Sequence, residues 1–299
     1  MRTIALICLA LVLASGPVLA HGDLARREGP VWTFDPWIVT PLLLVGVFYA
    51  LGMLALWRRT SVRRPLQGWQ GAAYWCGWVS LVGALVSPLH WLGEHLFSFH
   101  MIEHEILMAI SAPLLVVGQP IGTFLWSLPR PIRVAIGRYL KRPAVNGVWR
   151  WLSTGRNATL LHGLAIWAWH LPVLFDAAVA SVLFHRLQHL SFLVTALLFW
   201  WSVFRRSNCG LAAWHLFVTM LHTSVLGALM ALAPRVLYDA QTATAGAWGL
   251  TALEDQQLAG IIMWIPAGTV YAGAALAMTS IWIRQSGVNG RRGDAVGAF

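Results

Sequence analysis

Seven apolar stretches, each close to the length that crosses a lipid bilayer, limit how this 299-residue chain can fold. A helix needs about 20 apolar residues to cross about 30 Å of hydrocarbon. The stretches therefore predict an all-α membrane protein, a bundle of seven transmembrane helices that follows an N-terminal signal segment. They cover residues 37–57, 71–87, 96–117, 158–175, 184–204, 211–232 and 258–283. Pro172 lies near the end of the fourth stretch and is expected to end or kink that helix.

Composition excludes several other classes of protein. Only 11% of the residues are charged, against about 25% in soluble domains, so a water-soluble globule is excluded. The net charge of +10 would suggest a nucleic-acid partner in a soluble protein. Here the basic residues lie in loops between apolar stretches, and no platform of aromatic and basic side chains accompanies them. The expected partner is therefore membrane lipid and not nucleic acid. The three cysteines are far apart, and we expect neither a disulfide framework nor a thiolate metal site.

The first 20 residues have the features of a secretory signal peptide. Arg2 precedes an apolar run at residues 4–14, and small residues up to Ala20 suit cleavage there. The alternative is an uncleaved first helix. Both interpretations place His21 and the segment 21–36 outside the cytoplasm. If cleavage follows Ala20, the α-amine and the ring of His21 become a possible copper chelate.

Basic residues alternate from one connection to the next, which predicts the orientation of the chain. Sixteen of the 21 Lys and Arg residues lie in the connections after the first, third, fifth and seventh stretches. By the positive-inside rule these connections are cytoplasmic. We therefore expect a multi-pass protein of the bacterial inner (plasma) membrane, with its N-terminus outside. Its transmembrane domain would span residues 37–283, with an amphipathic cytoplasmic connection at 118–157 and a cytoplasmic tail at 284–299.

Eight of the eleven histidines fall at the predicted outer face, and four of them form two H-x-x-x-H pairs. Residues four apart share one face of a helix, so each pair can offer two ring nitrogens to one ion. Imidazole suits copper, zinc, iron and nickel, and imidazole with thioether suits Cu(I). The predicted metal ligands are His100, His104, His185 and His189, with His170 close by and with Met101 and Met108 as a soft-ligand path.

Acidic and amide side chains near these histidines are candidate supports for the ligands. Glu103, and Asp176 or Asp255 from the outer loops, are expected to accept ring N–H groups, with Gln256 as a further supporting side chain. Structural alternatives stay open. The two methionines can be core residues, Arg186 can anchor the interface or pair with Asp176, and the polar residues at the start of the last stretch can cap its helix.

Three sequence blocks resemble signatures of one membrane protein family. They are L-F-S-F-H-M-I-E-H-E-I-L-M-A-I-S-A-P-L-L-V-V-G-Q-P, W-H-L-P-V-L-F-D-A-A-V-A-S-V-L-F-H-R-L-Q-H-L-S-F with L-L-F-W-W after it, and E-D-Q-Q-L-A-G-I-I-M-W-I-P-A-G. In this order they resemble the integral-membrane cytochrome c oxidase assembly factor family called CtaG. The resemblance implies several membrane helices and a role in maturing haem–copper oxidases through copper. The matching positions are His100, His104, His170, His185, His189, Asp255 and Gln256.

The favoured hypothesis is a non-enzymatic assembly factor that holds copper as Cu(I) and delivers it to cytochrome c oxidase subunits. A periplasmic copper chaperone is a further expected partner. One alternative is a haem-b redox carrier, which would need ligands such as His162 and His222 in both membrane halves. The other is a copper permease with a polar path through His222 to His215. The sequence has no G-x-S-x-G or H-E-x-x-H motif, which argues against a hydrolase.

Overall fold

A computed structural model describes residues 29–58 and 65–296 of the chain. All of the regular elements in these two ranges are helices, and no strand occurs within them. The all-α prediction is therefore confirmed. The predicted signal segment and His21 lie outside the described residues, so the signal peptide stays a prediction.

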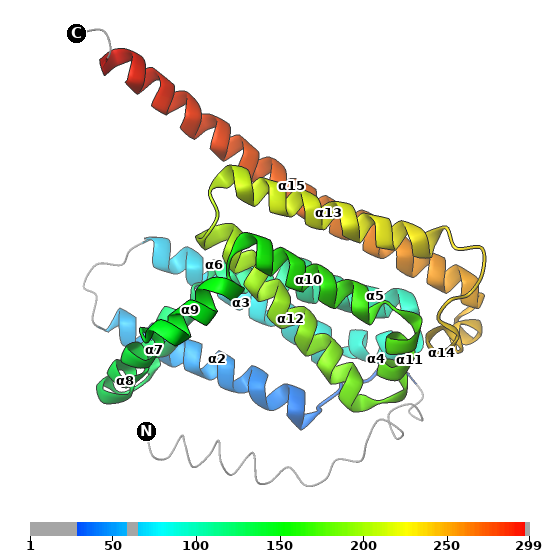
Figure 1. Ribbon diagram of the computed structural model, residues 1–299. Helices are drawn as coiled ribbons and strands as arrows, with labels where there is room; N and C mark the ends of the chain where they lie inside the picture. The colour runs from blue at the N-terminus through cyan, green and yellow to red at the C-terminus, as the bar shows by residue number, and fades with distance from the viewer. Residues whose placement is uncertain (1–28, 59–64, 297–299) are drawn as a thin grey trace.

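The helices follow one another in chain order from blue to red in Figure 1. Their bounds are α2 (Pro36–Trp57), α3 (Pro65–Val86), α4 (Pro88–His95), α5 (Phe97–Glu105), the π-helix η2 (Ile106–Ser111), α6 (Ala112–Val117), α7 (Pro120–Ser127), α8 (Arg130–Leu140), α9 (Pro143–Leu152), α10 (Gly155–Trp169), α11 (Pro172–Ala180), α12 (Val182–Arg205), α13 (Cys209–Ala231), α14 (Asp239–Thr242), the 3-10 helix η3 (Ala245–Trp248) and α15 (Ala252–Val296).

Five helices in the described part are long and apolar enough to cross a membrane, and two bent helix pairs would raise the number to seven. The five are α2, the continuous run Phe97–Val117, α12, α13 and the first 35 residues of α15. In one bent pair, α10 and α11 meet at 73° where Pro172 begins the second helix. Proline favours a bend because it lacks an N–H and its ring clashes with the preceding turn. In the other, α3 and α4 meet at 46° beside Pro88. The sequence did not predict α4, since the second apolar stretch was expected to end at residue 87.

The run Phe97–Val117 is the central element of the bundle. It is the most buried of the five candidate spans, and it packs against α3, α4, α12 and α15. A span surrounded by other helices can carry polar side chains because they face protein and not acyl chains. The fold therefore shields the histidine-rich stretch from lipid.

The helices α13 and α15 lie side by side along one edge of the molecule (Figure 1). Glycines allow their backbones to approach closely. A Cβ atom on Gly260 would lie 2.4 Å from the backbone nitrogen of Ala231, and one on Gly227 would lie 2.7 Å from that of Trp264. Small residues serve in this way where membrane helices associate by van der Waals packing.

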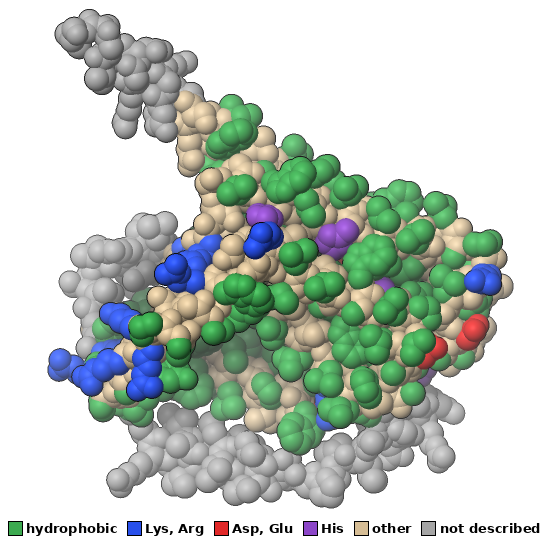
Figure 2. Space-filling model, viewed as in Figure 1, with side chains coloured by type: hydrophobic (Ala, Val, Ile, Leu, Met, Phe, Trp, Pro, Cys, Tyr) green, Lys and Arg blue, Asp and Glu red, His purple; other side chains and the backbone are tan. Residues whose placement is uncertain are grey.

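The predicted amphipathic connection at 118–157 consists of the three short helices α7, α8 and α9, with prolines at their starts. The first of them packs against α2, where Gly52 approaches the backbone carbonyl of Thr123. By contrast, α8 and α9 bury none of their side chains. Figure 2 shows Lys and Arg side chains gathered at this end of the molecule and acidic side chains at the opposite end.

Candidate metal centre

The helix α5 begins at a cap that another part of the chain supplies. The backbone N–H groups of Phe97 and Ser98 donate to the two carboxylate oxygens of Asp255 in α15, at 2.7 and 3.0 Å. First-turn amides have no partner within their own helix, and a buried carboxylate satisfies two of them here. Asp255 is fully buried. This contact fixes where α5 starts and therefore where its histidines lie.

Two histidine pairs, one on α5 and one on α12, face each other. The ring centroids of His100 and His104 are 4.2 Å apart, and those of His185 and His189 are 4.4 Å apart. Across the two helices, the ring centroid of His100 lies 5.4 Å from that of His185, and the ring centroid of His104 lies 5.0 Å from that of His189. The structure thus brings the four predicted ligands of the two pairs into one cluster. Helical spacing of four residues aligns the rings within each pair, and the packing of α5 near α12 brings the pairs together.

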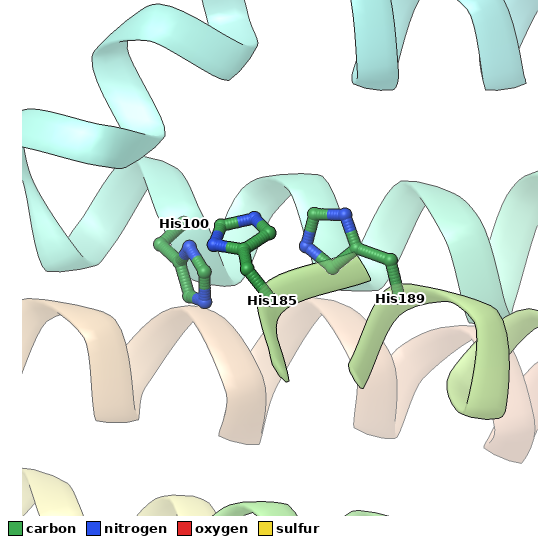
Figure 3. A group of neighbouring side chains, drawn as sticks. All are labelled: His100, His185 and His189. Atoms are coloured by element: carbon green, nitrogen blue, oxygen red, sulfur yellow. The ribbon is translucent and has the colours of Figure 1, made fainter. Parts of the chain in front are cut away.

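Three of these rings lie closest to the arrangement that a metal ion needs. One ring nitrogen from each of His100, His185 and His189 lies within 4.8 Å of the other two (Figure 3). Two nitrogens bound to one tetrahedral ion at about 2.0–2.1 Å are separated by about 3.3 Å. Side-chain rotations that shorten these distances by up to about 1.5 Å would therefore bring the three imidazoles into one coordination sphere.

The buried ring nitrogens of the cluster would be stabilised by a bound metal ion. Among the described residues, both ring nitrogens of His100 and of His104 lack a hydrogen-bond partner, as does Nε2 of His189. Buried polar atoms without partners cost free energy, and folded proteins contain few of them. The unpartnered atoms at this place also include Glu103 Oε2 and the side-chain amide atoms of Gln188, but the imidazole nitrogens among them suit an ion of copper, zinc, iron or nickel.

A buried carboxylate adjoins the histidines, as predicted for Glu103. Its Oε1 accepts a hydrogen bond from Nδ1 of His90 at 2.8 Å and lies 3.6 Å from Nδ1 of His189. Gly93 makes room for this side chain, because a Cβ there would lie 3.0 Å from Glu103 Oε2 and 3.3 Å from the Cα of His100. Glu103 therefore orients the rings beside it.

His90 is a member of the cluster that the sequence did not single out. Its ring lies 5.6 Å from that of His185 and 6.1 Å from that of His189. It comes from α4, the helix that follows the unexpected break at Pro88. Its sequence neighbourhood, rich in histidine and glutamate, was a signal, but the direction of α4 was needed to bring it to the site.

His170 lies near the cluster and shares two phenyl-ring neighbours with it. Phe175 contacts both His170 and His100, and Phe192 contacts both His170 and His104. Nδ1 of His170 donates to the carbonyl of Ile166 at 2.7 Å. Tyr238 donates to the carbonyl of His170 at 2.7 Å, and burial, with the nearby carboxylate of Asp176, raises the pKa of Tyr238 to about 12, so it stays protonated. Nε2 of His170 has no hydrogen-bond partner among the described residues, so its role as a ligand stays a prediction.

Met101 and Met108 belong to the hydrophobic core of the bundle. Both are almost completely buried. The backbone carbonyl of Met108 accepts the indole N–H of Trp200 at 2.9 Å within the π-helix η2. π-Helical turns free backbone groups for such contacts and often lie next to functional sites. The core interpretation of the methionines is favoured over a soft-ligand path.

The structure gives the remaining polar candidates contacts outside the histidine cluster. Asp255 and Gln256 support backbone, since Asp255 caps α5 and Gln256 bonds Leu237 N–H and the Arg235 carbonyl. Asp176 is exposed on α11. Arg186 pairs with Asp35, at 2.6 Å, in place of Asp176. These roles depend on contacts between distant parts of the chain.

Comparisons with known proteins support the resemblance found in the sequence. A family model described as cytochrome c oxidase caa3 assembly factor (Caa3_CtaG) matches residues 47–285. The chain is 28% identical over 270 residues to uncharacterized proteins of Mycobacterium bovis and Mycobacterium tuberculosis, and 25% identical over 280 residues to one of Mycobacterium leprae. Each match covers 85% of this chain and 40% of the relative, so the chain spans less than half the length of these relatives. No solved structure matches the chain.

Proposed function

The chain belongs to the family of cytochrome c oxidase caa3 assembly factors, and from this premise we propose that it holds copper between α5 and α12 for transfer to an oxidase. The cargo ion would bind His100, His185 and His189, with His104 within reach as a further ligand. The observation that carries this proposal is the convergence of three imidazoles, two of them buried and that of His185 half-buried, whose ring nitrogens lie within 4.8 Å of one another.

Charge favours a singly charged ion at this position. The ligands are neutral imidazoles, and Glu103 is the fully buried carboxylate that adjoins them. A buried ion is costly unless a charge of opposite sign lies close by. If Glu103 is ionised and both the ligand rings and its hydrogen-bond partner His90 are neutral, Cu(I) would give a net charge of zero, whereas Zn²⁺ or Cu²⁺ would leave one positive charge. We therefore infer Cu(I) as the cargo.

The arrangement suits temporary holding better than permanent storage. Imidazole ligands exchange a Cu(I) ion more readily than a closed thiolate cage would. The two adjacent pairs offer the ion alternative sets of nitrogens. The ring centroid of His104 lies 4.2 Å from that of His100 and 5.0 Å from that of His189. An ion can then change ligands stepwise, which is what delivery without a catalysed reaction requires.

We place the cluster at the outer face of a bacterial plasma membrane, with the C-terminus in the cytoplasm. The support is the charge distribution, because Lys and Arg gather at the end of the molecule that carries α8 and α9, and basic connections stay in the cytoplasm. In this orientation copper would arrive from a periplasmic copper chaperone and leave to cytochrome c oxidase subunits.

A haem-b carrier has weaker support. Nδ1 of His162 lies 3.1 Å from the Thr195 hydroxyl, and its Nε2 lies 3.4 Å from that of Tyr271, so both nitrogens have partners. A permease also has weaker support, since His215 and His222 pack against glycines of α10. We therefore favour a site that is loaded and unloaded from one side.

The test is a Cu(I) titration of the purified full chain in detergent against a chromophoric Cu(I) chelator. We expect about one tightly held Cu(I) per chain and its loss in the variant H100A/H185A/H189A. The control variant H95A/H215A/H222A removes three histidines outside the group and should keep the ion. Equal Cu(I) binding by the two variants would reject the site. Oxidase copper content in cells that carry each variant then tests the delivery step.

A further inference from the structure

An open cleft of about 950 Å³ lies at the end of the molecule away from the histidines. Its walls come from α9, the turn after α9 and the residue that follows α12. The lining residues are Asn146, Gly147, Arg150, Trp151, Thr154 and Arg206. His189 and Arg206 are separated by 17 positions along α12, or about 25 Å at 1.5 Å per residue, so the cleft is distinct from the metal centre.

Local contacts hold α9 in the position that forms the cleft. The ring of Trp149 packs edge-on against Trp201 of α12, with centroids 5.6 Å apart. The Ser153 hydroxyl donates to the carbonyl of Trp149, and the Asn157 amide donates to that of Trp151. These bonds end α9 and fix its last turn. The guanidinium of Arg150 is therefore presented beside Arg206 by an ordered scaffold.

No carboxylate among the described residues forms an ion pair with the arginines of the cleft, Arg150 and Arg206. The sequence contains no acidic residue between Glu105 and Asp176, or between Asp176 and Asp239. Arginine carries a planar fork of N–H donors that matches phosphate oxygens. Two such groups with the Asn146 amide at one cleft are a donor set for a phosphate monoanion.

The surroundings of the cleft are apolar, which points to a lipid as the source of that phosphate. Trp151 is 60% exposed and Val148 is 61% exposed on α9, and Tyr139 is 54% exposed on α8. Short helices with basic and apolar sides lie at the boundary between headgroups and acyl chains. Tryptophan favours the same depth, because its ring is apolar and its N–H is polar.

We infer that this cleft binds the phosphate of an anionic phospholipid headgroup, with Arg150 and Arg206 as its charge partners and Asn146 as a further donor. Trp151 would then pack beside the glycerol and the first acyl carbons. The positive-inside rule explains why this end of the chain is basic. It does not explain why two unpaired arginines converge on one cleft.

Native mass spectrometry of the delipidated full chain in detergent tests the inference, with dioleoyl phosphatidylglycerol as the titrated lipid. We expect at least one lipid to be retained by the wild type. The variant R150A/R206A should weaken binding by about tenfold or more, since basic residues at such pockets each contribute substantially to binding of anionic lipid. The matched control R130A/R138A removes the same charge from α8, outside the cleft, and should change binding by about threefold at most, because exposed charges there act only through a screened field.

Further arms identify the ligand. Dioleoyl phosphatidylcholine should not compete, because its headgroup has no net charge, and inorganic phosphate should compete only at far higher concentration. Equal losses in R150A/R206A and R130A/R138A would overturn the inference in favour of diffuse attraction. Equal binding of the two lipids, or tight binding of inorganic phosphate without lipid, would also overturn it. If the double alanine variant does not fold, R150K/R206K decides: weakened lipid binding with an unchanged melting temperature supports the cleft, and unchanged binding rejects it.

Discussion

Glu103 and His90 form the closest polar contact within the histidine cluster, with Oε1 and Nδ1 2.8 Å apart. Both side chains are almost completely buried, and they come from different helices, α5 and α4. The same carboxylate oxygen lies 3.6 Å from Nδ1 of His189. One buried acid therefore links a residue outside the two histidine pairs to a member of the proposed ligand group.

We expect Glu103→Gln to weaken Cu(I) binding by about 10- to 100-fold, the usual effect of removing an outer-shell partner. The amide keeps the shape of the side chain but cannot balance the charge of the ion. Competition with a Cu(I) chelator measures the change. Asp239→Asn removes an exposed acid at the same end of the molecule and serves as the control. Equal Cu(I) affinity of wild type and Glu103→Gln would contradict the charge argument.

Gly93→Ala should disturb the centre without unfolding the protein. The added Cβ would lie 3.0 Å from Glu103 Oε2 and 3.3 Å from the Cα of His100, so the carboxylate must move away from its histidine partners. We expect about a tenfold loss of Cu(I) affinity, on the same scale as other outer-shell changes. The matched control is Gly83→Ala, because a Cβ there meets nothing within 4 Å. A similar Cu(I) affinity in both alanine variants would show that Gly93 is not a constraint on the site.

Asp255→Ala should destabilise the bundle by removing the cap of α5. The substitution leaves the buried amides of Phe97 and Ser98 without acceptors, at a cost of about 1.5–3 kcal/mol for each hydrogen bond to a charged group. A lower unfolding temperature in detergent is the expected result. Asp176→Asn, at an exposed position, should leave the temperature almost unchanged. If the Asp255→Ala variant is as stable as the wild type, the claim that this cap stabilises the bundle is wrong.

Gly260→Leu should separate α13 from α15. Even a Cβ at this position would lie 2.4 Å from the backbone nitrogen of Ala231, and backbone cannot yield as a flexible side chain does. We expect a loss of several kcal/mol, seen as poor yield of folded protein or a large fall in unfolding temperature. Gly273→Leu places the same side chain on α15 where nothing lies within 4 Å. Comparable stability of the two variants would refute close packing of the glycine.

The sequence alone determined the features that depend on local geometry and on transfer from water to lipid. Long apolar stretches predicted the candidate membrane helices, and residues four apart predicted that His100 faces the same way as His104 and His185 the same way as His189. Helical spacing is fixed by the backbone, so these two side-chain pairs needed no knowledge of other helices. The three sequence blocks also identified the family that the comparisons support.

Only the tertiary structure decided which side chains complete the centre. His90 lies beside Glu103 because the chain bends at Pro88, His170 packs against phenyl rings that also contact the pairs, and Asp255 caps a helix 158 positions away. These contacts join residues distant in sequence. They are set by the angles at which helices bend and pack, and the interactions that fix those angles are spread over many side chains, so no local pattern records them.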